Sequence, residues 1–89
     1  MIKHYNIRVY GLVQGMGFRA SACSQARKLG LAGFVRNEPD GSVYVEAEGS
    51  EVSLNTFLRW CRRGPLFAKV ERVEVEEGSV QKFTDFTIQ

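Results

Sequence analysis

Residues 14–19 combine backbone and side-chain groups that are suited to binding an anion. Gly15 and Gly17 stand directly before a helical pattern that begins at Phe18, and no Ser, Thr, Asp or Asn precedes that helix as a cap. Its first backbone N–H groups therefore lack a side-chain acceptor. Arg19 adds a positive charge to the positive end of the helix dipole, and no carboxylate follows within the helix. Unpaired amides beside a guanidinium predict a site for phosphate or a similar anion.

Other interpretations of this stretch are less well supported. The two glycines could simply shape a turn, with Arg19 pointing into water. The segment from Gly15 to Ala20 also matches the loose G-x-G-x-x-G/A dinucleotide pattern, with Glu38 at about the expected distance. That fold needs parallel strands and a longer chain, whereas Pro-Asp-Gly at residues 39–41 predicts a hairpin turn. No Gly-Lys-Ser/Thr sequence follows, which excludes a Walker-type loop.

Asn37 is the second candidate for a functional residue, because it ends a predicted strand directly before the hairpin turn. The expected topology returns the end of this strand toward the start of the first helix. An uncharged amide that can donate and accept hydrogen bonds would then lie beside the anion site. From the residues alone, an ordinary turn asparagine bonded to its own backbone is the favoured interpretation.

The periodicity of the chain predicts seven elements that would position these residues. Alternating apolar positions predict strands, and apolar positions three or four residues apart predict helices. The helix at 50–63 has Ser50 as its N-cap, and the strand at 67–76 loses its alternation once, which suggests a bulge. The expected elements are strands at 5–13, 31–36, 42–48, 67–76 and 83–88, and helices at 18–29 and 50–63.

This order, β-α-β-β-α-β with a short final strand, predicts an α+β fold of the ferredoxin-like, two-layer type. We expect residues 1–89 to form one domain, with an antiparallel sheet, both helices on one face and the other face exposed. The chain has 44% hydrophobic residues but no apolar run long enough to span a membrane. It also lacks a secretory signal at its start, so we expect a cytoplasmic protein that binds no membrane.

Charge and cysteine content limit the possible partners further. The net charge of +2 is too small to indicate nucleic acid, although the first 37 residues contain no acidic side chain. Cys23 and Cys61 lie far apart in the sequence and His4 is the one histidine. A zinc site is therefore not expected, and the thiols should be reduced and partly buried. We expect no metal and no cofactor.

Two motifs resemble those of acylphosphatases. Residues 11–19, GLVQGMGFR, are similar to the G-x-V-Q-G-V-x-F-R motif of that family, with Met16 in place of valine. Residues 33–37, GFVRN, together with DGSV at 40–43 resemble the second motif, G-x-V-x-N followed by D-G-x-V. The similarity extends over the whole chain. Some members have a hydroxyl residue where this chain has Glu38.

The resemblance implies metal-independent hydrolysis of the carboxyl-phosphate bond in small acyl phosphates by a monomer. Asn37 would position the attacking water. Phosphate would be held by the loop from Gln14 to Phe18 and by Arg19, that is by Gln14, Gly15, Met16, Gly17, Phe18 and Arg19.

The absence of a catalytic carboxylate pair fits this chemistry. The carboxylate leaving group has a conjugate-acid pKa of ~4 and needs no general acid, and a loose transition state demands little deprotonation of the water.

Two alternatives come from other classes. A ferredoxin-like binding module could bind RNA on its open sheet face, where Tyr10 and Tyr44 could lie together, although no RNA-binding motif is present. The pocket could also bind carbamoyl phosphate without hydrolysing it, since an equivalent domain handles that compound in a hydrogenase maturation protein. We expect a small-molecule acyl phosphate as the partner and no nucleic acid.

Overall fold

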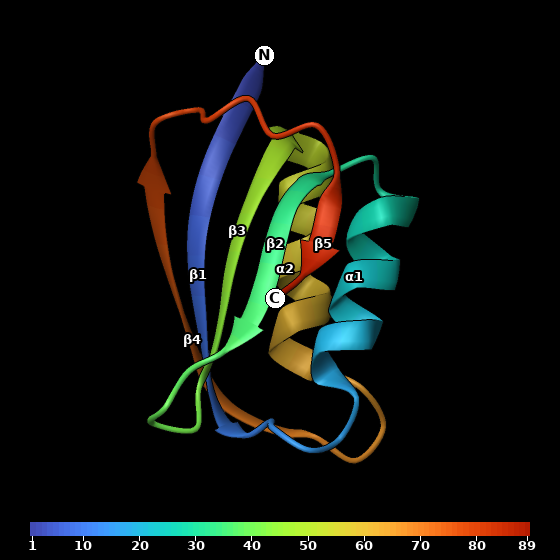
Figure 1. Cartoon of the computed structure of the whole chain (residues 1–89), viewed down its shortest axis with the longest axis vertical. Coiled ribbons are helices and arrows are strands. Elements are labelled where there is room, and N and C mark those ends of the chain that lie inside the picture. Colours follow the sequence, from blue (N-terminus) through green and yellow to red (C-terminus); the bar gives the residue numbers. More distant parts are fainter.

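The computed structural model describes residues 1–89, which form five strands and two helices in the predicted order (Figure 1). The predicted fold class is therefore confirmed. Most boundaries lie within two or three residues of the expected ones. The strands are β1 (Ile2–Leu12), β2 (Ala32–Asn37), β3 (Val43–Ser50), β4 (Lys69–Gly78) and β5 (Phe86–Ile88), and the helices are α1 (Phe18–Lys28) and α2 (Glu51–Arg63).

The strands form one sheet in the order β4-β1-β3-β2-β5. The first four strands pair antiparallel, but β5 runs parallel to β2. The prediction of a wholly antiparallel sheet is therefore wrong at this edge. The chain leaves β4 and crosses the end of the sheet to reach the start of β2, so that β5 enters from the same end as β2 (Figure 1).

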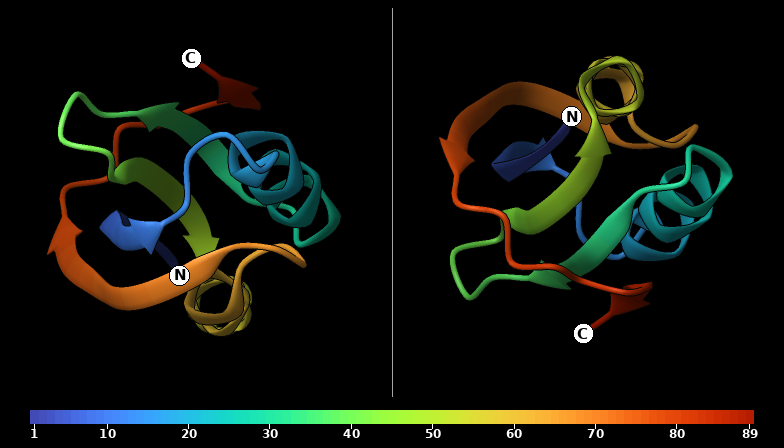
Figure 2. Two further views of the ribbon diagram at one scale, coloured as in Figure 1. Left: turned by 90° about the horizontal axis from the view of Figure 1, so that it is seen from below. Right: turned by 90° about the horizontal axis from the view of Figure 1, so that it is seen from above.

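Both helices pack on the same face of the sheet, as predicted (Figure 2). The predicted apolar stripe of α2 is buried, and the Ser50 side chain caps the helix by accepting a hydrogen bond from Ser53 N at 3.1 Å. Neither helix is long and apolar enough to cross a membrane. The core between the layers contains Ile7, Val9, Val35, Val43, Val45, Phe18, Leu54, Phe57 and Phe86.

A bulge adjusts the end of β1 before the chain enters the 13–17 loop. The pairing of β1 with β4 shifts between Tyr10 and Gly11, so that Glu71 has no partner in β1. This is the irregularity that the sequence indicated in the fourth strand. Gly11 has φ 129°, and a side chain there would meet the backbone of β4, because a Cβ would lie 2.1 Å from Lys69 O.

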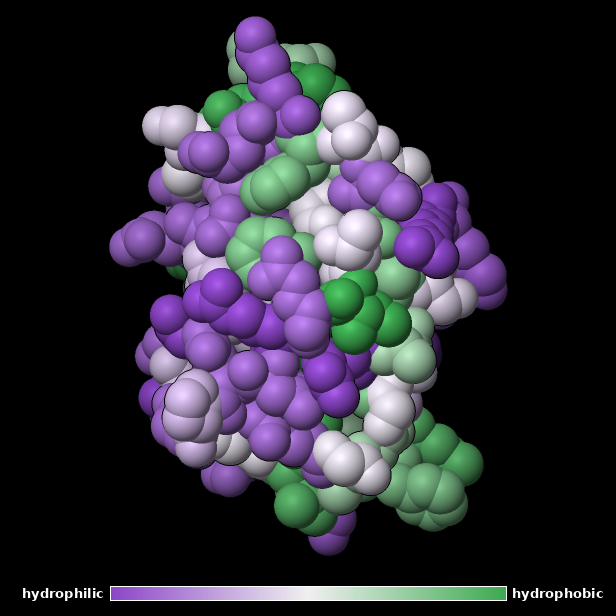
Figure 3. All heavy atoms as spheres, viewed as in Figure 1, coloured by the Kyte–Doolittle hydropathy of each residue, from purple (hydrophilic) through white to green (hydrophobic).

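The face opposite the helices is only partly exposed, which corrects the expectation of an open sheet. The segment of residues 79–85 crosses one end of it, and Phe83 stacks against His4 with ring centroids 6.0 Å apart. His4 is 2% exposed and Glu48 is 3% exposed. Away from this segment the surface is mainly hydrophilic (Figure 3). The alternation of polar side chains predicted that this face is exposed to solvent. Two of these side chains, His4 and Glu48, are instead covered by the segment of residues 79–85, which has no regular structure.

His4 and Glu48 form a buried pair beneath this segment. The ring Nδ1 of His4 lies 2.7 Å from Glu48 Oε2, and its Nε2 lies 3.2 Å from Glu46 Oε1. The backbone N–H groups of Gln81 and Phe83 donate to the Glu48 carboxylate. Burial alone would raise the pKa of Glu48, but the hydrogen bonds from these amides and from His4 outweigh burial and lower it.

Both cysteines are buried thiols. The Cys23 thiol donates to Phe86 O at 3.6 Å, which connects α1 to β5. Burial raises the pKa of Cys61 to about 12. At neutral pH this side chain is therefore an uncharged part of the core rather than a nucleophile.

Candidate active site

A hollow of about 230 Å³ lies where the end of β2 meets the start of α1. It brings together Arg19 and Asn37, the two residues singled out in the sequence, although they are 18 positions apart. Gln14 and Met16 do not line it. The lining residues are Val13, Gly15, Gly17, Phe18, Arg19, Ala20, Asn37 and Ile88.

The start of α1 has no side-chain cap, as the sequence predicted. Gly17 occupies the N-cap position with φ 75° and ψ 19°, a left-handed conformation that glycine adopts without strain. No acidic residue lies in the first turn. The backbone N–H groups of residues 17–20 donate no hydrogen bond, and the first such bond runs from Ser21 N to Gly17 O at 3.0 Å. The positive end of the helix dipole thus opens toward the hollow.

Arg19 lines this hollow, and no Asp or Glu side chain pairs with it. Its Nη1 donates to the backbone carbonyl oxygen of Gln89 at 3.1 Å, and none of the ion pairs in the structure includes it. No acidic side chain therefore neutralises the guanidinium charge. An anion in the hollow would meet this charge and the open helix amides together.

Asn37 stands at the end of β2, opposite Val43 of β3. It shares the helix-facing side of β2 with Val35, which is why its side chain reaches the hollow. The side chain makes no hydrogen bond within the protein. The ordinary turn role is filled by Asp40, whose Oδ1 accepts from Ser42 Oγ at 2.6 Å and from Ser42 N at 2.9 Å. These two hydrogen bonds lower the pKa of Asp40.

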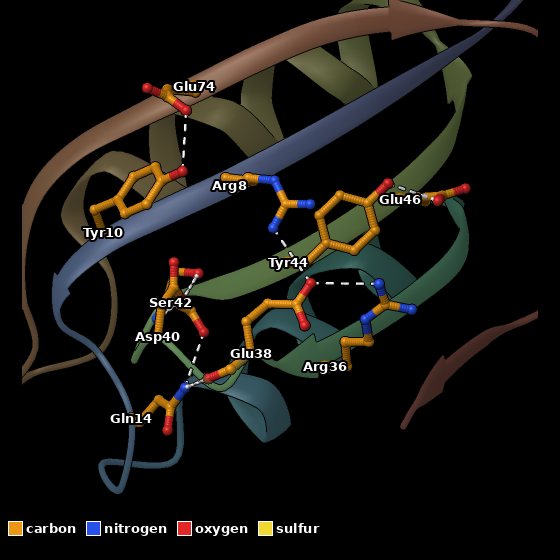
Figure 4. Close-up of polar contacts among 10 residues, drawn as sticks. All are labelled: Arg8, Tyr10, Gln14, Arg36, Glu38, Asp40, Ser42, Tyr44, Glu46 and Glu74. Carbon is orange, nitrogen blue, oxygen red and sulfur yellow. Dashed lines mark hydrogen bonds and ion pairs between the residues drawn. The ribbon is translucent and has the colours of Figure 1, made fainter.

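The Gln14 side chain points to the hairpin turn rather than into the hollow (Figure 4). Its Nε2 donates to the carbonyl oxygens of Glu38 at 2.8 Å and of Ser42 at 2.9 Å. The sequence indicated the loop that contains Gln14, but nothing in its pattern indicated this link to residues more than twenty positions away.

Glu38, the neighbour of Asn37, faces the other side of the sheet. Its Oε1 accepts hydrogen bonds from Arg8 Nη1 at 3.2 Å and from Arg36 Nη2 at 3.3 Å. The two guanidinium groups lie over the ring of Tyr44, 4.5 and 4.8 Å from its centroid (Figure 4). Burial, together with the hydrogen bond to Glu46, raises the pKa of Tyr44 to about 12. The Glu38 carboxylate is thus held by two cations away from the hollow.

No group of three or more His, Cys, Asp or Glu side chains is arranged to hold a metal ion. The groups available at the hollow are backbone amides, one guanidinium and one side-chain amide. These can bind an anion and orient a polar molecule beside it.

Comparison with known proteins agrees with this arrangement. The family model described as Acylphosphatase matches residues 5–88. The chain belongs to the acylphosphatase family. The resemblance seen in the two sequence motifs is therefore confirmed.

The similarity to members of the acylphosphatase family covers nearly the whole chain. An acylphosphatase of Methylococcus capsulatus is 47% identical over 88 residues, which cover 98% of this chain and 96% of that protein. The crystal structure of acylphosphatase from Bacillus subtilis has 40% identity and a TM-score of 0.96, and the match covers 100% of this chain and 99% of that one. The structure of full-length HypF contains a similar region, with 30% identity and a TM-score of 0.91 over 12% of its chain.

Proposed function

We propose that this protein is an acylphosphatase that hydrolyses the carboxyl-phosphate bond of small acyl phosphates. The observation that supports this most directly is the hollow in which an uncapped helix start, an unneutralised Arg19 and an unbonded Asn37 side chain meet. A family in which curated relatives are named acylphosphatase supports the same conclusion. Residues 1–89 would act as one domain.

The phosphoryl group would be held by the loop and the guanidinium. The open N–H groups near Gly17 and Phe18 would donate to the phosphoryl oxygens, and Arg19 would offer two parallel N–H donors. Gly15 and Met16 would complete the loop around the anion. Charge spreads over the three phosphoryl oxygens in a loose transition state, so fixed donors and one cation act directly where charge develops.

Asn37 would position the attacking water. Its amide oxygen can accept a hydrogen bond from the water while its N–H₂ group donates to a phosphoryl oxygen. The leaving carboxylate has a conjugate-acid pKa of ~4, so it departs without a proton donor. Because the hollow supplies no general base, hydrolysis would depend on alignment of the water with the phosphorus rather than on proton abstraction.

The substrate would be a small acyl phosphate, because a hollow of about 230 Å³ limits the size of the acyl group that can enter with the phosphoryl group. We further propose that the protein acts as a monomer in the cytoplasm, without metal or cofactor.

The RNA-binding alternative has less support. Tyr10 and Tyr44 do lie on the sheet face that RNA would use, but Arg72 lies 3.9 Å from the Tyr10 ring centroid and two arginines flank Tyr44. Base stacking would first have to displace these guanidinium groups.

The decisive experiment is an assay with a chromogenic acyl phosphate, with inorganic phosphate as competitor. The proposal predicts turnover that phosphate inhibits competitively and that a chelator leaves unchanged. Carbamoyl phosphate is tested as a second substrate, because the alternative function is to bind this compound without hydrolysing it. Tight phosphate binding without turnover of either compound would favour a binding module. No binding of phosphate at all would contradict the assignment of the hollow.

A further inference from the structure

We propose that Gln14 is a positioning residue that fixes the anion-binding loop relative to Asn37. This inference depends on the proposed function, because it concerns the alignment of phosphate and water. The Gln14 side chain would not bind substrate itself. It would act through its bonds to the hairpin turn, which begins directly after Asn37.

The two acceptors of Gln14 lie at the mouth of the turn that Asn37 begins. Glu38 directly follows Asn37, and Ser42 directly precedes Val43, the cross-strand partner of Asn37. Glu38 N also donates to Ser42 O at 2.9 Å, which closes the turn between the same two residues. The Gln14 N–H₂ group therefore bonds to both sides of the turn, at the residues next to Asn37 and Val43.

No other hydrogen bond joins residues 13–17 to residues 37–42. The loop itself contains Gly15 and Gly17, both with positive φ, and its amides are open. Without Gln14, the loop would be connected to the hairpin only through β1 and the packing of Val13 and Phe18. One side chain thus makes the direct link between the proposed phosphate site and the proposed water site.

The turn is held firmly on its other side, so the link connects the loop to a fixed point. The Glu38 carboxylate bonds to Arg8 of β1 and Arg36 of β2, and both guanidinium groups pack on Tyr44 of β3 (Figure 4). Three neighbouring strands therefore restrain the residue whose carbonyl accepts from Gln14. Reaction rates fall steeply when reacting groups are misplaced by about 1 Å, so this restraint would matter more for turnover than for binding.

Gln14→Met tests this, because methionine has a similar volume and no donor. We expect kcat to fall about 10- to 100-fold, while the inhibition constant for inorganic phosphate changes less than about 3-fold. Gln81→Met is the matched control, since Gln81 Nε2 also donates to a backbone carbonyl, that of Ser79 at 3.0 Å, outside the hollow. The control should keep the kcat of the parent protein. Gln14→Asn, which retains a donor on a shorter side chain, provides a second and milder variant.

The same substitution in an Asn37→Ala background shows whether Gln14 acts through Asn37. If it does, Gln14→Met lowers kcat little further once the Asn37 amide is gone. An equal fold-loss in both backgrounds would overturn the proposal, as would a loss of phosphate affinity that parallels the loss of kcat. A parent protein without turnover would refute the proposed function instead. The hydrogen bonds from Gln14 to Glu38 and Ser42 would then be tested by NMR. The side-chain amide hydrogens of Gln14 should exchange slowly with solvent, and fast exchange would refute the proposal.

Discussion

The two ends of the sheet differ in how far their charged and polar groups are bonded within the protein. At the end near the N-terminus, Glu48 is buried and accepts hydrogen bonds from two backbone amides beside the His4 ring. At the other end, no acidic side chain pairs with Arg19 or with the first amides of α1, and Arg19 bonds to the main-chain oxygen of Gln89. Both places concentrate polar groups, yet the first bonds them within the protein, whereas the second leaves the first amides of α1 and the Asn37 side chain without a partner.

This difference separates a structural role from a functional one. Charges that are satisfied internally hold segments together, and here Glu48 fastens residues 79–85, which have no helix or strand. Donors left open destabilise the free protein slightly and become favourable only when an anion arrives. Mutations at the two ends should therefore have opposite signatures, with stability lost at one and activity lost at the other.

The largest effect on stability is expected for Glu48→Ala. Removing this buried carboxylate leaves the N–H groups of Gln81 and Phe83 and the Nδ1 of His4 without their acceptor or partner, and breaking such a buried pair typically costs about 3–5 kcal/mol in the free energy of unfolding. Chemical denaturation measures it. The kcat of the folded protein should stay close to that of the parent protein, because Glu48 lies far from the hollow.

Glu51→Ala is the matched control for this change, because it removes an exposed ion pair of similar length. Glu51 Oε2 lies 2.9 Å from Lys3 Nζ, and the side chain of Glu51 is 55% exposed. The loss should be small, because water screens the attraction between exposed charges. Equal losses for the two variants would contradict the distinction between a buried, fully bonded carboxylate and a surface one.

Arg19→Ala should show the reverse pattern. Loss of one fixed donor to the transition state typically costs about 2.7–4 kcal/mol, which corresponds to roughly 100- to 1000-fold in kcat. Stability should change little, because the removal of a positive charge from the positive end of α1 offsets the lost hydrogen bond to Gln89 O. Steady-state kinetics and thermal unfolding test the two halves of this expectation.

Arg62→Ala serves as the control for Arg19→Ala, since Arg62 is an exposed arginine at the favourable, C-terminal end of α2. It should retain full turnover. If Arg19→Ala also kept its activity, the assignment of Arg19 as the phosphate-binding cation would fail.

The pH dependence of the free energy of unfolding should reflect the titration of Glu48. The pKa of Glu48 is lowered from its ordinary value of 4.5, so its contribution to stability is present above that pH. It is lost as the pH falls through the lowered value, because protonation weakens the bonds to Gln81, Phe83 and His4. The free energy of unfolding, measured from pH 6 to 3, should fall more steeply than in Glu48→Gln. Parallel curves would show that Glu48 is not the group responsible.

The sequence predicted the region around Arg19 and Asn37 better than the region around His4 and Glu48. The missing cap before Phe18, the charge of Arg19 and the position of Asn37 at a strand end are local features, and the structure places these residues in one hollow. The order of elements, the Ser50 cap and the bulge opposite Gly11 also follow from local patterns. Such features are visible because periodicity and end signals depend on neighbouring residues.

The parts that sequence reasoning missed all depend on contacts between distant segments. His4 and Glu48 occupy alternating polar positions that are typical of a solvent-facing strand, and only the segment of residues 79–85 buries them. The parallel pairing of β5 and the link from Gln14 to the turn are of the same kind. No local sequence pattern predicts that residues 79–85 cross the sheet or that the Gln14 side chain bonds to the carbonyl oxygens of Glu38 and Ser42.

A small gain in stability is expected from adding a negative charge at the start of α1. Ala20→Glu places a carboxylate in the first turn of α1, on the rim of the hollow. It should stabilise the protein by about 0.3–1 kcal/mol, because a negative charge suits this end of the helix dipole. The same carboxylate should weaken phosphate inhibition and lower turnover, since it competes with the substrate for Arg19 and the open amides. Ala20→Gln, with a similar shape and no charge, separates charge from bulk. If Ala20→Glu were stabilised and still bound phosphate as well as Ala20→Gln does, the open donors would not be the anion site.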